Sequence, residues 1–356
     1  ARFTHLFSEE SNLTIQTYFD HTNRKTPNAR TPFNYDLTTY DLDIQYRFPI
    51  GAHQSILIGG GYRYIEDKTN STSIDPQNRA MPLISGFIQD EITLLPERLK
   101  FTIGSKFMNN VFTGFEFQPS ARFAFTPNTK NTLWAAVSRS VRTPSRFDND
   151  IVINKLRLTP FGFKSEKVMA YELGYRLQPI ERVTLSLSSF YNQYSDLRSL
   201  NKVFLSAKDS TIISNDQKAT SWGFEFFANY QTVEWWRIRA GYTLAKKNTS
   251  STATNVYPIS NNFEGVDPEH QVMIQSIMDL PKHYSLDVTM RYVDALKATA
   301  PTPSTPAYFN LDVRLAKEIK AFEISLVGQN LLAPQHLETG LYPISRSVYG
   351  KITYQF

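Results

Sequence analysis

Apolar and polar residues alternate one by one along many stretches of this chain of 356 residues. The stretch 40–48 reads YDLDIQYRF, and the same alternation recurs in 183–192, 286–292 and 309–315. A period of two residues puts all the apolar side chains on one face of a β-strand, whereas a helical period would scatter them around the axis. We count roughly seventeen such segments, most of them about 9–13 residues long, which predicts an all-β protein.

Segment length and the positions of the aromatic residues favour a membrane protein. Strands of soluble proteins most often have about 5–6 residues, whereas a tilted strand that crosses a bilayer needs about 9–11. Aromatic side chains recur near the segment ends, as at Tyr40, Phe48, Trp222 and Tyr230, where the membrane surfaces would lie. These features predict a transmembrane antiparallel β-barrel whose outer face is apolar and whose inner face is charged. An array of soluble β-sandwiches is the alternative fold.

The connections between the segments alternate between short and long. In an outer-membrane barrel, short turns face the periplasm and long loops face the outside, so the C-terminus is expected to be periplasmic. The odd number of segments, together with a start in mid-strand, predicts that an N-terminal part of the molecule precedes this chain. The short connections lie near 49–53, 95–98, 127–130, 178–181, 232–234, 280–283 and 317–319, and the long ones near 21–35, 67–79, 141–164, 198–215, 248–265 and 333–345.

The composition excludes several kinds of function. The chain has no Cys, which rules out a disulfide framework, a Cys-based zinc site and a thiol nucleophile. Its net charge of +5 comes from interspersed residues, so no nucleic-acid-binding surface is indicated. The six His residues are scattered, and neither a Gly-rich phosphate loop nor a Gly-x-Ser-x-Gly nucleophile motif is present. We therefore predict no enzyme, no protein metal site and no resident cofactor. No run of 18 apolar residues predicts a transmembrane helix.

Several motifs occur in a characteristic order between residue 133 and residue 356. The stretch 133–146 reads LWAAVSRSVRTPSR, and 165–176 reads SEKVMAYELGYR. They are followed by DPEHQ at 267–271, DLP at 279–281, VGQNLL at 327–332 and RSVYGKITYQF at 346–356. Taken together, these motifs resemble the C-terminal part of a TonB-dependent outer-membrane receptor of the ferric-siderophore type.

This resemblance implies a barrel of about 22 strands that encloses an N-terminal plug domain, with a short TonB-contacting segment before the plug. Residues 1–356 would be a partial barrel domain that supplies about strands 6 to 22. Such a receptor lies in the Gram-negative outer membrane, surrounded by lipid, and is expected to be a monomer. It would import a ferric siderophore with energy from the TonB–ExbB–ExbD complex, and iron would enter only as part of that ligand.

Five basic residues gather where a predicted wall strand meets the longest loop: Arg139, Arg142, Arg146, Lys155 and Arg157. Guanidinium groups at the mouth of a barrel would suit an anionic chelate, through charge-assisted hydrogen bonds to carboxylate or catecholate oxygens. Alternatively, Arg142 and Arg146 pair with carboxylates such as Asp148 and Asp150 and brace the loop, and we favour this alternative for these two residues. Exposed charges such as those of Lys155 and Arg157 are often only solvated.

Aromatic residues with a polar edge in other long loops are further candidates for ligand contacts, because such side chains are typical of concave binding sites. They also pack loops onto themselves, and we favour that alternative. The residues are Tyr257, Phe263, His336 and Tyr342.

Three alternative functions stay open at this point. The cargo could be haem, cobalamin, a nickel chelate or an oligosaccharide instead of a siderophore. Haem is disfavoured, since Arg142-Thr-Pro-Ser occupies the region where haem receptors carry a Phe-Arg-Ala-Pro motif. The protein could also be a passive porin-like channel or a surface receptor without transport.

Overall fold

The computed structural model describes residues 1–26, 34–153, 156–159, 162–205, 208–251, 266–298, 303–338 and 342–355, with the backbone alone for 202–205 and 208–211. Within these ranges one sheet holds seventeen strands. They are β1 (Arg2–Leu6), β2 (Asn12–Arg24), β3 (Tyr35–Ile50), β4 (Gln54–Thr69), β5 (Asn78–Leu95), β6 (Leu99–Asn110), β7 (Gly114–Asn128), β8 (Asn131–Arg142), β11 (Glu166–Ile180), β12 (Val183–Leu205), β13 (Lys208–Val233), β14 (Trp236–Ser251), β15 (His270–Leu280), β16 (Tyr284–Val293), β17 (Tyr308–Ile319), β18 (Phe322–Gln329) and β21 (Ser347–Tyr354).

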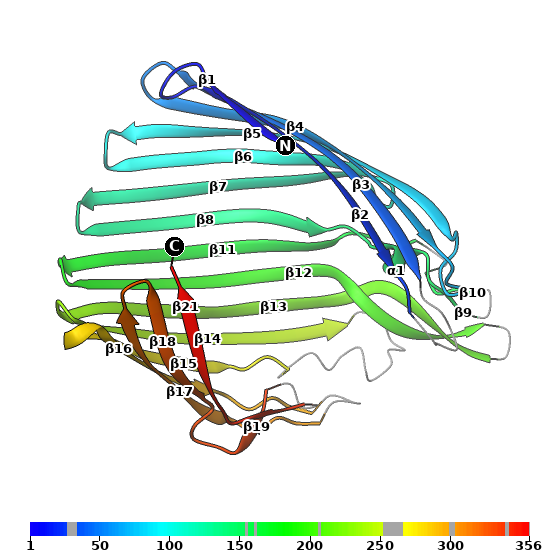
Figure 1. The fold of residues 1–356 in the computed structure, drawn as a ribbon. Helices are drawn as coiled ribbons and strands as arrows, with labels where there is room; N and C mark the ends of the chain where they lie inside the picture. The colour runs from blue at the N-terminus through cyan, green and yellow to red at the C-terminus, as the bar shows by residue number, and fades with distance from the viewer. Residues whose placement is uncertain are drawn as a thin grey trace.

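Each strand of this sheet pairs antiparallel with the next one in chain order, and the result is a curved wall (Figure 1). In the described part of the chain, β1 pairs only with β2 and β21 only with β18, so the wall is not closed. The predicted fold class and the predicted number of strands are confirmed. A sheet in which consecutive strands are neighbours throughout has no second layer to pack against, unlike a sandwich.

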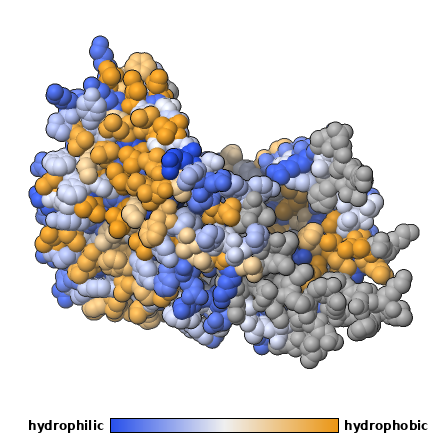
Figure 2. Space-filling view, turned by 90° about the horizontal axis from the view of Figure 1, so that it is seen from below, coloured by the Kyte–Doolittle hydropathy of each residue, from blue (hydrophilic) through white to orange (hydrophobic). Residues whose placement is uncertain are grey.

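The alternation in the sequence separates the two faces of the wall. Leu42, Tyr62 and Ile84 are opposite one another on β3, β4 and β5, and all three are exposed. Such residues gather into a broad hydrophobic area in Figure 2. We call this the outer face. The opposite, inner face carries charged residues that pair between neighbouring strands. These ion pairs include Asp41 with Arg63 at 2.8 Å, Asp287 with Arg314 at 2.9 Å, and Arg291 with Asp312 at 3.0 Å.

The short connections agree with the sequence, but two of the long ones are shorter than expected. β12 and β13 run for 23 and 26 residues, so most of the stretch 198–215 is a paired hairpin. β4 and β5 likewise extend to Thr69 and from Asn78. A strand that continues above a membrane meets water on both faces, so its sequence loses the alternation that would mark it as a strand. The polar composition of these two stretches therefore predicted connections that are longer than the observed ones.

Large rings on the inner face pack closely against glycines of the neighbouring strands. A Cβ added at Gly174 in β11 would overlap the indole of Trp134 in β8, to which Gly174 is directly opposite. A Cβ at Gly223 in β13 would overlap the carbonyl oxygen of Leu244 in β14 and lie 2.9 Å from the ring of Phe190 in β12. Glycine is required where a neighbouring strand or ring approaches this closely. Close packing between the strands therefore excludes a side chain at both positions.

One short helix and five further small elements of the described residues lie in the connections. These are α1 (Arg146–Asn149), β9 (Val152–Ile153) and β10 (Leu156–Arg157) between β8 and β11, the 3-10 turn η2 (Pro281–His283), and the hairpin of β19 (Gln335–Leu337) with β20 (Pro343–Ser345). No helix in the described ranges is long and apolar enough to cross a bilayer.

Candidate functional site

The connection between β8 and β11 folds back toward the inner face at the end of the wall that carries the long connections (Figure 1). It begins with α1, whose first turn is held by a capping box. The Ser145 hydroxyl accepts a hydrogen bond from the backbone N–H of Asp148 at 3.2 Å, and the Asp148 carboxylate accepts one from the backbone N–H of Ser145 at 3.0 Å. This reciprocal pairing satisfies two N–H groups that a helix start leaves free. Ser145 and Asp148 therefore fix the point where the loop turns.

The carboxylate of Asp150, directly after α1, is fully buried between two arginines. Its Oδ1 lies 2.6 Å from Nη1 of Arg79 in β5, and its Oδ2 lies 3.0 Å from Nε of Arg146. Arg146 also reaches Asp67 in β4, with 3.0 Å between Nη1 and Oδ2. One buried cluster of opposite charges thus ties α1 to two wall strands. Removing one partner from such a cluster leaves an uncompensated buried charge, which costs about 3–5 kcal/mol.

The carboxylate of Asp148 is the centre of a second group of contacts on the other side of α1. Arg142 pairs with two carboxylates, with 3.0 Å from its Nη1 to Oδ2 of Asp148 and 2.6 Å from its Nε to Oε2 of Glu166 in β11. Nε of Arg198 in β12 lies 3.7 Å from Oδ1 of Asp148. Burial by itself would raise the pKa of Asp148, but hydrogen bonds from Ser145 and the Arg142 guanidinium together hold the pKa of this carboxyl below its ordinary value. Asp148 therefore stays ionised and keeps its partners.

Beyond α1 the connection packs on the hairpin of β12 and β13 through a small apolar core. Ile151, Phe163 and Ile213 are buried together, and Leu158 and Leu200 pack against them. Backbone hydrogen bonds support this contact, with 2.7 Å from the N–H of Ile213 to the carbonyl oxygen of Leu158. The described residues of the β8–β11 connection are thus anchored to the wall and to this hairpin, and anchored elements hold binding groups in place better than mobile loops do.

Two of the predicted arginines form ion pairs that hold the connection in place, and a third is exposed. Arg142 and Arg146 pair with Asp148 and Asp150, as the favoured alternative expected, and the side chain of Arg146 is only 8% exposed. Arg157 in β10 is exposed, and its Nη2 donates to the backbone oxygen of Asp75 at 3.3 Å. Among the residues that the structure describes, Arg157 has no carboxylate partner. Its charge is therefore available at the mouth. Lys155 lies outside the described residues.

The remaining candidates occupy other connections. The side chain of His336 in β19 is 7% exposed, and its ring lies 4.3 Å from that of Tyr308, with Nε2 at 3.1 Å from Glu338. His336 thus pairs with Glu338 of its own connection and packs on the ring at the start of β17. Tyr342, near the start of β20, is 79% exposed. Tyr257 and Phe263 lie outside the described residues. The described ranges hold no group of three His, Asp or Glu side chains that could bind a metal ion.

Sequence reasoning missed Arg79, Asp67 and Arg198 as parts of this site. Arg79 and Asp67 fall in a stretch that was expected to be a loop, and their partners lie 71 and 79 positions later in the chain. No spacing rule connects residues that far apart. The capping box was readable, since Ser145-Arg-Phe-Asp148 has its characteristic spacing.

Comparisons with solved structures give the same fold. The copper transporter OprC has a TM-score of 0.76 and 14% identity, and the match covers 100% of this chain and 66% of that one. The siderophore receptor PirA from Acinetobacter baumannii has a TM-score of 0.75 and 15% identity, over 97% and 60% of the two chains. The ferric enterobactin receptor PfeA from Pseudomonas aeruginosa has a TM-score of 0.78 and 14% identity, over 100% and 61%. The chain thus spans less than two thirds of the length of these structures.

A search of curated proteins found no match. The family assignment rests on a family model described as "TonB dependent receptor-like, beta-barrel", which matches residues 1–331. This match covers strands β1 to β18 of the wall and the β8–β11 connection, and the structural neighbours include receptors of the same kind. The chain belongs to the family of TonB-dependent receptor β-barrels, as its sequence motifs predicted.

Proposed function

We propose that the whole protein is an outer-membrane receptor that binds a ferric siderophore at its extracellular loops and imports it with energy supplied through TonB. Family membership supports energy-coupled transport and argues against a catalytic role. Binding alone cannot move a ligand against its own affinity, so release inward needs a conformational change driven by a partner. The TonB–ExbB–ExbD complex would supply that energy by acting on a plug domain, and the receptor would act as a monomer.

The observation that carries the choice of cargo is the exposed Arg157 in β10 of the β8–β11 connection. A guanidinium without a carboxylate partner attracts oxygen-rich anions and can bind two oxygens at once. A ferric chelate made of carboxylate or catecholate groups has this chemistry. The exposed Tyr342 could add a ring contact to such a ligand. Two of the structural neighbours bear titles that name siderophores or enterobactin, whereas OprC is titled a copper transporter.

The test measures uptake by cells that carry or lack the full-length gene. Under iron limitation, cells with the gene should accumulate radioactive iron from a ferric siderophore, and collapsing the proton gradient should abolish that uptake. Parallel assays with copper, haem and cobalamin identify the cargo if the siderophores fail. Uptake of one of these instead would overturn the siderophore proposal, and uptake that survives the loss of the gradient would overturn energy coupling.

A planar-bilayer recording of the full-length protein separates a receptor from a passive channel. The receptor is expected to show no steady conductance, because the lumen of a barrel of this width must be filled. Continuous open currents from the purified protein would instead favour a porin-like function.

A further inference from the structure

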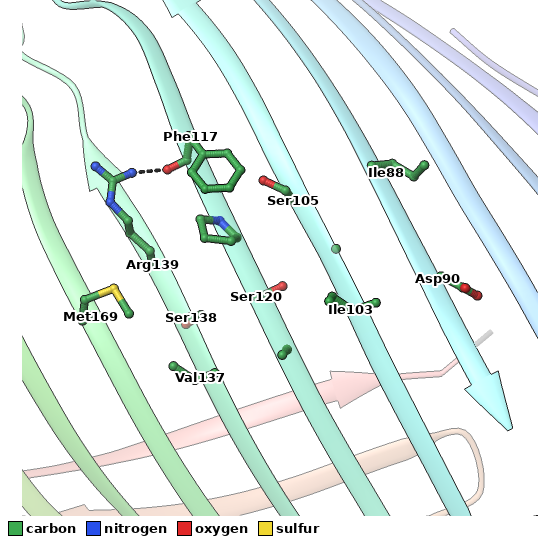
Figure 3. A pocket seen from close by; sticks show the side chains of 13 residues that line it. Ile88, Asp90, Ile103, Ser105, Phe117, Ser120, Val137, Ser138, Arg139 and Met169 are labelled. Carbon is green, nitrogen blue, oxygen red and sulfur yellow. Dashed lines mark hydrogen bonds between the residues drawn. The ribbon is translucent and has the colours of Figure 1, made fainter. Parts of the chain in front are cut away.

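A groove of about 550 Å³ crosses the outer face of β5, β6, β7, β8 and β11. Figure 3 shows its lining, with Ile88 on one side and Met169 on the other. Small residues form its floor, including Gly104, Pro119 and Ala121. This groove lies on the face opposite to the ion pairs of α1, so it is separate from the proposed ligand-binding mouth.

The groove follows from an interruption of the sheet between β7 and β8. Their pairing extends from Asn128 and Asn131 only as far as Ser120 and Ser138, although β7 begins at Gly114 and β8 continues to Arg142. Pro119 comes next to the last paired residue of β7 and has no N–H to donate, and prolines interrupt strand pairing for this reason. The two strands therefore separate in this half of the wall.

Side chains replace the missing backbone hydrogen bonds. Nη1 of Arg139 donates to the carbonyl oxygen of Phe117 (Figure 3). The side-chain oxygen of Gln118 accepts from the backbone N–H of Val141 at 3.3 Å. Such replacement is needed because unpaired backbone groups at membrane depth are costly. Arg139 thus spans the gap and lies at one end of the groove.

Arg139 points to the outer face, since it is directly opposite Met169 of β11 and both line the groove. Among the residues that the structure describes, it has no carboxylate partner. A cation on the lipid-facing side of a barrel is unfavourable at depth, by about 2–4 kcal/mol at the midplane, and becomes tolerable near the membrane surface. Arg139 is near the end of β8 that leads into the β8–β11 connection, where a lipid headgroup can reach it.

We propose that the groove holds an acyl chain of an outer-leaflet lipid whose phosphate pairs with Arg139. Only one guanidinium donor is engaged with Phe117, which leaves others for a phosphate, and guanidinium and phosphate form bidentate pairs. The carboxylate of Asp90 lines the groove on the far side from Arg139 (Figure 3) and would repel a phosphate there. The charges at the two ends therefore set one direction for the lipid, with its headgroup at Arg139.

The test uses the full-length receptor in detergent, with bound lipid measured by native mass spectrometry after detergent exchange. The probes are lipid A, dephosphorylated lipid A, phosphatidylethanolamine and inorganic phosphate. The wild type should retain lipid A in preference to the other three. Arg139→Gln should weaken its retention about tenfold, as expected for the loss of one charge-assisted pair. Arg176→Gln, which removes a cation from the inner face, is the matched control and should leave retention unchanged.

A second variant keeps Arg139 and fills the floor of the groove. Ala121→Trp should reduce lipid A retention while a heat-modifiability gel still shows a folded barrel. Equal retention by both variants and the wild type would overturn the proposal. Equal binding of dephosphorylated lipid would overturn the role of the phosphate, and retention of lipid A unaffected by Ala121→Trp would overturn the role of the chain. A lipid-free dimer of the wild type would show that a second copy covers the groove. None of these readouts depends on the cargo proposed above.

Discussion

Nη1 of Arg79 donates to Oδ1 of Asp150 over 2.6 Å, although the two residues are 71 positions apart in the chain. This contact joins the middle of the β8–β11 connection to β5, and Asp150 is fully buried in it. The longest connection of the described wall is thereby fixed at its turning point. The position of the exposed Arg157 depends on this anchoring, because β10 follows α1 after a few residues.

Asp150→Asn should release the connection from the wall. An amide cannot neutralise both Arg79 and Arg146, so the free energy of opening this segment should fall by about 3–5 kcal/mol. Hydrogen exchange of residues 146–153 measures the effect. The control is Glu269→Gln. Glu269 forms an exposed ion pair with Lys246, with 3.4 Å between Oε2 and Nζ, and such a pair should contribute about 0–1 kcal/mol to stability. Unchanged protection in Asp150→Asn would show that the buried cluster does not hold the loop.

Acid should loosen the same connection through Asp148. The folded pKa of this carboxyl lies below its ordinary value, so its stabilising contribution is complete above about pH 4 and is lost as the pH falls through the folded pKa. Protease resistance of the loop should stay constant from neutral pH to about pH 5 and fall in stronger acid. Asp148→Asn should weaken the loop at neutral pH and flatten the acid transition. If Asp148→Asn loses protease resistance over the same pH range as the wild type, groups other than Asp148 cause the acid transition.

Gly174→Ala should destabilise the wall. The added methyl group would overlap the indole of Trp134, and overpacking of this kind costs about 1–3 kcal/mol. Gly241→Ala is the control on the same inner face, because its nearest neighbour is Cε of Met273 at an ordinary 3.9 Å. Denaturant unfolding of the two full-length variants compares them. Equal midpoints would mean that the indole moves aside freely.

Arg157→Ala should weaken binding of an anionic ferric chelate about tenfold without affecting the fold, because Arg157 is exposed and bears one charge-assisted contact in the proposed complex. Arg98→Ala removes the same charge from a short turn at the opposite end of the wall and should bind as the wild type does. Direct titration of the purified receptor gives both affinities. If the two variants bind equally well, the cargo is recognised by other residues.

The sequence was informative wherever a strand has one face in lipid and one in the lumen. Asp41 and Leu42 are neighbours in the chain, yet one pairs with Arg63 on the inner face and the other is exposed on the outer face. The alternation with a period of two residues is enough to assign each residue of such a strand to one of the two faces. The same logic explains why the number of strands could be counted before the structure was known.

The sequence was less informative at the mouth of the wall. Above the membrane both faces of a strand meet water, so the extension of β12 beyond Arg198 left no periodic signal. The choice of Asp67 and Arg79 as partners of the loop depends on the three-dimensional proximity of β4 and β5, which a single sequence does not encode locally. The pairing of Arg142 and Arg146 with nearby carboxylates was predictable because those partners are within a few residues.

The tall hairpin of β12 and β13 has a consequence for the kinetics of ligand capture. Its backbone is hydrogen-bonded from Val183 and Tyr230 up to Leu205 and Lys208, so this side of the rim is already ordered before any ligand arrives. A preorganised rim loses little conformational entropy upon docking. Association on this side should therefore proceed in one fast phase governed by diffusion and charge, with no slow step of loop rearrangement.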